Sequence, residues 1–214
     1  MQSESTRQSA AEEKENPAQT ALDLPKIPDW RVVGEVLDTY IIVEQAGEVL
    51  FIDKHAAHER INFEKLKAAP TEIMSQLLMV PLTASLTGEE TAAVLENRAL
   101  LAQCGFEVEE FGADTLLLRQ SPADVNETAA LETLETLAGD LLDGKRLDPA
   151  ALRDKLLHTI ACKSAIKAGW HTDPVERDAL VRQVLERDDI NYCPQGRPVC
   201  ITLTRSQLEK QFKR

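Results

Sequence analysis

Apolar and polar residues alternate along positions 30–52, and many of the apolar ones are β-branched or aromatic. This pattern is typical of strands with one buried face. Residues 30–43 therefore predict one long strand or two short ones, and residues 49–52 predict the return strand of a hairpin. The turn at 45–48 contains Gly47, which adopts the positive φ of a tight turn at little cost.

The pattern changes to helix-forming residues from Ala56 onward, and we expect a helix to about Ala69. Beyond it, residues 76–149 predict elements in the order β-α-β-β-α. The expected segments are a strand at 82–86, a helix at 88–104 capped by Thr87 and ended by Gly105, strands at 106–111 and 115–119, and a helix to about 142 capped by Asn126. This order is typical of a small α+β unit inserted into another.

Two further helices are expected at 148–169 and 173–187, because each begins with Asp-Pro and proline is favoured at the first helical position. A strand at 199–203 and a short helix at 205–213 follow. Strands and helices are thus interspersed without an internal repeat, and the expected fold class is α+β.

Length and composition limit the functions that this chain can have. Its 214 residues suffice for one large domain or two small ones, and the 4% aromatic content argues against stacking platforms for single-stranded nucleic acid. The formal net charge of −12 repels phosphates, so this chain alone should bind double-stranded DNA weakly. No apolar run suits a transmembrane helix, and four widely spaced cysteines without an export signal indicate reduced thiols in the cytoplasm.

The first residues have a different composition from the rest. Residues 1–24 carry almost no large apolar side chain and predict a disordered linker, with order beginning near Leu24 and Pro25. A linker at the start indicates that this is the C-terminal piece of a longer protein.

Residues with metal-binding chemistry gather directly after the apolar strand at 49–52. Positions 53–59 contain two carboxylates and two imidazoles. If the helix begins near His55, then His55 and Glu59 share one helical face, which suits a divalent metal ion. A metal site needs three or four ligands. Cys162 and Cys193 are the sulfur candidates, although isolated cysteines are more often core residues.

Other polar residues have simpler interpretations. His58 lies off the face of His55 and Glu59 and is expected to be a solvated helix residue. Glu64 is expected to support the site from outside or to pair with Arg60 or Lys67. The remaining expectations are surface positions for His158 and His171, core positions for Cys104 and Cys200, and a role for Arg197 in holding its turn.

Four short motifs give these residues a family context. They are Asp-x-His-Ala, two residues, Glu, four residues, Glu at 53–64, then Ala-Cys-Lys at 161–163, Cys-Pro-Gln-Gly-Arg-Pro at 193–198 and Phe-Lys-Arg at 212–214. In this order they resemble the motifs of the C-terminal domain of the MutL family of mismatch-repair proteins, in its endonuclease-bearing branch. The family has Gln where Lys54 stands and His where Gln195 stands.

The resemblance implies a fold of two lobes. Residues 25–75 and 150–214 would form a dimerisation lobe that carries the metal site. Residues 76–149 would form an inserted regulatory lobe, which agrees with the β-α-β-β-α order. The implied assembly is a homodimer.

The resemblance also implies ligands. His55, Glu59, Cys162 and Cys193 would bind one or two divalent metal ions, with Zn²⁺ in a structural role and Mn²⁺ in catalysis. Gln195 stands at the position of a metal-ligating His, and its amide is a weaker ligand. Bound metals suit phosphodiester hydrolysis, because they polarise a phosphoryl oxygen and lower the pKa of bound water.

The implied catalytic residues are Asp53, Glu59 and Arg214. Asp53 is the carboxylate most directly tied to cleavage, and Arg214 would complete the site, in its own or the other subunit of the dimer. Lys54 should point away from His55 and its neighbours, because successive residues at a strand end face opposite sides.

The implied function is a latent, metal-dependent endonuclease that nicks one DNA strand during mismatch repair. Gln76, Leu78, Met79 and Pro81 resemble the family's sliding-clamp-binding peptide, and a clamp would hold an acidic chain on DNA. The other implied partners are the mismatch-recognition protein MutS and an N-terminal ATPase domain, in the bacterial cytoplasm near the nucleoid and with no membrane. The alternative is a non-catalytic dimerisation and clamp-docking module with a structural zinc.

Overall fold

The computed structural model describes residues 29–69, 72–165 and 172–214. The linker expected at 1–24, the start of order near residue 25 and the positions of Gly169 and His171 lie outside these residues. The helix expected to run to 169 ends earlier, at Ser164. Within them, no helix has the length and apolar character needed to cross a membrane.

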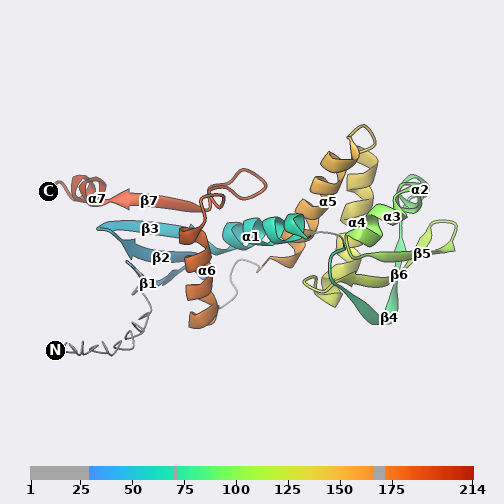
Figure 1. Ribbon diagram of the computed structural model, residues 1–214, viewed down its shortest axis with the longest axis horizontal. Coiled ribbons are helices and arrows are strands. Elements are labelled where there is room, and N and C mark those ends of the chain that lie inside the picture. Colours follow the sequence, from blue (N-terminus) through green and yellow to red (C-terminus); the bar gives the residue numbers. More distant parts are fainter. Residues whose placement is uncertain (1–28, 70–71, 166–171) are drawn as a thin grey trace, which may run out of the picture.

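The described residues form helices and two antiparallel sheets, which confirms the α+β class (Figure 1). The strands are β1 (Trp30–Val36), β2 (Tyr40–Gln45), β3 (Glu48–Asp53), β4 (Ser75–Ser85), β5 (Glu107–Gly112), β6 (Thr115–Pro122) and β7 (Cys200–Thr204). The helices are α1 (Lys54–Ala68), α2 (Gly88–Glu96), α3 (Arg98–Gln103), α4 (Glu127–Asp143), α5 (Pro149–Ser164), α6 (Pro174–Glu186) and α7 (Arg205–Gln211). The sheets lie at opposite ends of an elongated molecule, with α1 between them (Figure 1).

The first sheet has four strands in the order β1-β2-β3-β7, all antiparallel. The expected hairpin between β2 and β3 is confirmed, and Gly47 has a φ of +81°. Alternate residues of β2 and β3, namely Ile41, Val43, Leu50 and Ile52, form a buried inner face. Leu180, Val181 and Val184 of α6 pack in the same core, so α6 covers this face.

The second sheet has three strands in the order β4-β6-β5, and α4 packs against it. Residues 78–81 form a bulge in the edge strand β4, because Leu77 pairs with Gln120 and Leu82 pairs with Leu118. Leu156, Leu157 and Ile160 of α5 belong to this second core. The second core therefore includes side chains beyond residue 149, where the sequence suggested a boundary.

Helix α1 reaches both cores. Ala56 and Ala57 near its start pack in the first core, whereas Leu66 near its end packs in the second. Its middle packs along α5, which gives one of the larger helix contacts in the described part of the chain. Any side chain at the start of α1 is therefore close to the first sheet and to the end of α5.

Helix starts agree well with the sequence. Thr87, Asn126, Asp148 and Asp173 each cap a helix through a side-chain oxygen. The single helix expected at 88–104 is wrong: it breaks at Asn97 into α2 and α3. The Asn97 side-chain amide donates to the Ala93 carbonyl oxygen at 2.8 Å, a local bond that competes with regular helix.

Candidate metal centre

The junction between β3 and α1 is held by several hydrogen bonds. Asp53 ends β3, and its Oδ1 accepts a bond from the Ala56 backbone N–H at 3.0 Å, which makes it the N-cap of α1. The backbone N–H of Asp53 donates to the Val199 carbonyl at 2.9 Å, and that of Lys54 donates to the Thr39 carbonyl at 3.0 Å. The start of α1 is thus fixed by segments from both sides of the sheet.

Three side chains meet next to this junction and could hold a metal ion. Ligand atoms of His55, Glu59 and Cys162 all lie within 4.8 Å of one another, and we call these three residues the metal centre. His55 and Glu59 share a face of α1, as the sequence predicted, with 3.4 Å between His55 Nε2 and Glu59 Oε1. Cys162 comes from α5, which packs against α1.

Glu59 is the most unusual member because its side chain is 0% exposed. One oxygen, Oε2, accepts a hydrogen bond from Arg197 Nη2 at 2.9 Å, whereas Oε1 is buried, lies 3.4 Å from His55 Nε2 and makes no well-aligned hydrogen bond among the described residues. A buried carboxylate oxygen that lacks a well-aligned donor is costly. A cation bound at Oε1 would remove this cost, so the residues fit a metal ion.

The environment of Cys162 has two consequences for its thiol. Burial, followed by a hydrogen bond with Glu59 and the charge of this carboxylate, raises the pKa of Cys162 to about 11. The thiol is therefore protonated at neutral pH, and a metal ion that binds it must displace the proton. Its sulfur also accepts a bond from Gln195 Nε2 at 3.8 Å, so the turn at 193–197 reaches the metal centre.

That turn has a fixed shape. The Cys193 N–H donates to the Arg197 carbonyl and the Gly196 N–H donates to the Cys193 carbonyl, both at 2.8 Å, and Gly196 has a φ of +83°. Cys193 is buried in the first core and lies outside the three-residue metal centre. Arg197 interacts with both Cys193 and the metal centre. A hydrogen bond with the Cys193 side chain, and after it the hydrogen bond with Glu59, raises the pKa of the Arg197 guanidinium.

Several sequence expectations change with this geometry. Arg197 does more than hold the turn, because it pairs with the buried Glu59, a contact that the sequence did not predict. Glu64 pairs with Arg60 at 2.7 Å, as one of the alternatives proposed. His58 is half-buried rather than solvated, and burial, followed by the charges of His55 and Lys54, lowers its pKa.

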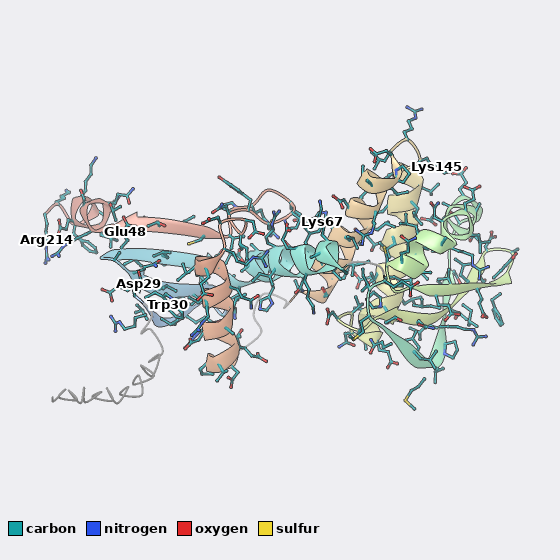
Figure 2. All side chains as sticks on the ribbon, viewed as in Figure 1. Asp29, Trp30, Glu48, Lys67, Lys145 and Arg214 are labelled. Carbon is teal, nitrogen blue, oxygen red and sulfur yellow. The ribbon has the colours of Figure 1, made fainter. Side chains whose placement is uncertain are left out.

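Arg214 lies far from the metal centre of its own chain. Thr204 pairs with Glu48 at one end of β3, whereas α1 begins at the opposite end of this strand. Figure 2 shows Arg214 beyond the Glu48 end of the sheet. The structure therefore does not bring Arg214 together with His55 in one chain.

The clamp-type peptide is divided between the core and the surface. Met79 is 94% exposed, whereas Leu78 is 3% exposed and packs in the second core. The choice of Leu78 as a docking side chain is therefore wrong for this conformation, and Leu77 and Val80 are exposed instead. Gln76 is half-buried and donates to the Val125 carbonyl at 2.8 Å, and Pro81 is also half-buried.

Two antiparallel sheets, an α1 helix that joins two cores, and a His-Glu-Cys centre at its start define an α+β protein with a candidate metal site. Residues 33–172 match the family model described as the MutL C terminal dimerisation domain. The match covers more than half of the chain. The chain belongs to the MutL family and corresponds to its C-terminal domain.

Curated relatives agree with this assignment. The chain is 39% identical over 186 residues to the DNA mismatch repair protein MutL of Geobacter sp. (strain M21), which covers 86% of the chain and 29% of the relative. It is 34% identical over 189 residues to that of Thermoanaerobacter pseudethanolicus, covering 88% of the chain and 31% of the relative. With the same protein of Halalkalibacterium halodurans it shares 32% over 209 residues, covering 96% and 33%. The chain thus spans about a third of the length of these relatives.

Proposed function

We propose that this chain is the metal-dependent DNA-nicking domain of a mismatch-repair protein. The observation that carries the proposal is the metal centre, in which ligand atoms of His55 and Cys162 converge on the fully buried Glu59 carboxylate. A nick in a DNA strand requires hydrolysis of a phosphodiester, which acidic and imidazole side chains alone catalyse poorly. Zn²⁺ or Mn²⁺ at this centre would polarise a phosphoryl oxygen and supply activated water.

The residues around the centre have distinct roles in the proposal. His55, Glu59 and Cys162 hold metal, and sulfur and imidazole favour zinc while carboxylates also suit manganese. Cys193 and Gln195 would join as further ligands from the turn at 193–197. Gln195 already contacts the Cys162 sulfur.

Asp53 is the proposed catalytic carboxylate, together with Glu59. Asp53 is held beside His55 by its capping bond to the Ala56 N–H, so its position is fixed before substrate binds. The distant Arg214 would act in the partner's centre of a dimer. The full active site would then need two copies of the chain.

Dimerisation itself has a suitable surface. The face of the first sheet opposite α6 exposes or half-exposes apolar side chains that belong to neither hydrophobic core: Ile42, Val49, Phe51, Ile201 and Leu203. An apolar sheet face left to water is unfavourable, and a second copy would cover it. We propose a homodimer through this face, with residues 25–75 and 150–214 as the dimerisation lobe and 76–149 as the regulatory lobe.

The β4 bulge, residues 78–81, is the proposed clamp-docking segment. Met79 and Val80 protrude from the edge strand and line a cavity of about 250 Å³ with Leu82, Glu127 and Thr128. Binding to a clamp around the duplex would offset the repulsion between DNA and a chain of charge −12. MutS, DNA and an N-terminal ATPase domain complete the proposed assembly, which would act near the nucleoid of the bacterial cytoplasm.

A nicking assay on supercoiled plasmid, with Mn²⁺ and with or without the sliding clamp, tests the activity. We expect Asp53→Asn to abolish nicking while the protein stays folded, because Asn is as good an N-cap as Asp. Asp148→Asn is the matched control. It changes the N-cap of α5, about 20 Å of helix away from Cys162. Equal nicking by wild type and Asp53→Asn would rule out the proposed endonuclease activity of this domain.

The second candidate is a non-catalytic dimerisation and clamp-docking module with a structural zinc. The observation that favours it is Gln195, an amide at the edge of the metal centre that cannot act as a base. Bound zinc with no nicking in any condition of the same assay would select this function.

A further inference from the structure

Lys54 is a buried cation that the proposed chemistry does not use. Its side chain is 2% exposed, and Nζ forms an ion pair with Glu35 Oε1 and a 3.3 Å hydrogen bond with Thr172 Oγ1. Glu35 is itself only 13% exposed, and Thr172 is buried. A lysine is rarely buried to this degree unless it is paired, and Glu35 supplies a carboxylate partner for it.

The pair connects distant parts of the first sheet. Glu35 of β1 is opposite Ile41 of β2, and Ile41 is opposite Ile52 of β3. Lys54 follows Ile52 by two residues, and both side chains are buried. The ion pair therefore spans β2 and joins the start of α1 to β1.

Lys54 also stands between the two residues on which the proposed site depends most. Asp53 precedes it and His55 follows it, so a shift of Lys54 moves both. We propose that the buried Lys54–Glu35 ion pair is a positioning pair that fixes the β3–α1 junction in the geometry of the metal centre. The expected change in zinc affinity rests on the proposed function, whereas amide exchange at the β3–α1 junction can be measured without metal.

The physical reason is the cost of removing the carboxylate partner of a buried charge. Removal of one partner of a buried ion pair is strongly destabilising, whereas replacement of both by neutral groups is often tolerated. Glu35→Gln should therefore draw Lys54 toward solvent and loosen the backbone on either side of it. Glu35→Gln combined with Lys54→Gln should restore the junction, because no charge is left behind.

Hydrogen exchange by NMR on the metal-free protein tests the pair. The reporters are the backbone amides of Asp53, Lys54 and Ala56, which donate to Val199, Thr39 and the Asp53 side chain. We expect exchange at these amides to rise roughly tenfold in Glu35→Gln and to return close to wild type in the double variant. Amides of β6 in the second sheet should not change, which separates a local effect from general destabilisation.

Controls make each outcome informative. Glu44→Gln removes the exposed Arg31–Glu44 ion pair of the same sheet and should leave the junction amides unchanged. If Glu35→Gln does not fold, Glu35→Asp keeps the charge with a shorter reach and should give a smaller but clear increase in exchange. Wild-type exchange at the junction in a folded Glu35→Gln or Glu35→Asp protein would overturn the proposal.

Zinc titration of the same proteins adds the functional readout. Glu35→Gln should bind zinc roughly tenfold more weakly than wild type, within the range for groups that orient ligands, and the double variant should recover. A wild-type protein that binds no zinc would refute the proposed metal function and leave the exchange result to decide the pair. Unchanged zinc affinity in Glu35→Gln would refute the positioning role.

Discussion

The metal centre and the β4 bulge are built in opposite ways. The metal centre joins His55 and Glu59 of α1 with Cys162 of α5, and its Glu59 is fully buried. The β4 bulge is one continuous segment in which Met79 and Val80 face solvent. One site depends on the packing of distant helices, and the other on the local shape of an edge strand.

This contrast indicates how each site tolerates change. A buried polar group is energetically favourable only while its hydrogen-bond partners stay in place. The metal centre therefore depends on the turn at 193–197 as well as on α1. The β4 bulge has few such constraints on its exposed side chains. Its buried residue, Leu78, belongs to the second core instead.

The largest effect is expected within the β4 bulge itself. Leu78→Ala should lower the free energy of unfolding by about 2–5 kcal/mol, because it leaves a cavity in the second core. The neighbouring Met79→Ala is the matched variant and should change it by no more than about 0.5 kcal/mol. Urea unfolding measures both, and equal losses would show that Leu78 is not a core residue.

The next effect concerns the metal centre. Cys162→Ala removes a proposed ligand and should weaken zinc binding by more than about 100-fold, beyond the usual cost of losing an outer-shell partner. Cys200→Ala is the control, since this half-buried cysteine lies in β7 and outside the metal centre. Competition with a chromogenic chelator gives both affinities. The same affinity in the two variants would exclude sulfur ligation by Cys162.

A gain is expected when the turn is given a stronger ligand. Gln195→His places an imidazole where an amide now contacts the Cys162 sulfur, and it should raise zinc affinity by about tenfold, or about 1.4 kcal/mol. The same competition assay measures the gain. An unchanged affinity would count against a ligand role for position 195.

The smallest effect is expected at the end of the chain. Arg214→Gln should change zinc affinity by no more than about twofold, because Arg214 and the metal centre lie at opposite ends of the first sheet. Nicking by the same variant should fall if Arg214 acts in the partner's centre. A large loss of zinc affinity would show that the two regions are coupled within one chain.

The sequence predicted most of the local structure and part of the metal centre. Caps and turns at Thr87, Asn126 and Gly47 depend on the chemistry of a few neighbouring residues, so they could be recognised directly. The pairing of His55 with Glu59 follows from helical spacing. Local rules failed at Asn97, where the side-chain amide and the backbone N–H both donate to the Ala93 carbonyl and the expected helix divides into two.

Contacts between distant segments were not predictable in this way. Nothing in the spacing of Glu35 and Lys54 indicates an ion pair across β2, because it depends on strand order and register. The same holds for Arg197 and the buried Glu59. In the β4 bulge, the irregular register decides that Leu78 is buried while Leu77 is exposed.

The central claim is that Cys162 and His55 bind one metal ion together. X-ray absorption at the zinc edge, on the zinc-loaded protein, tests it directly. We predict sulfur near 2.3 Å and nitrogen or oxygen near 2.0–2.2 Å, the usual bond lengths for such ligands, with the sulfur signal reduced in Cys162→Ala. A spectrum with only nitrogen and oxygen neighbours, identical in wild type and Cys162→Ala, would contradict the account.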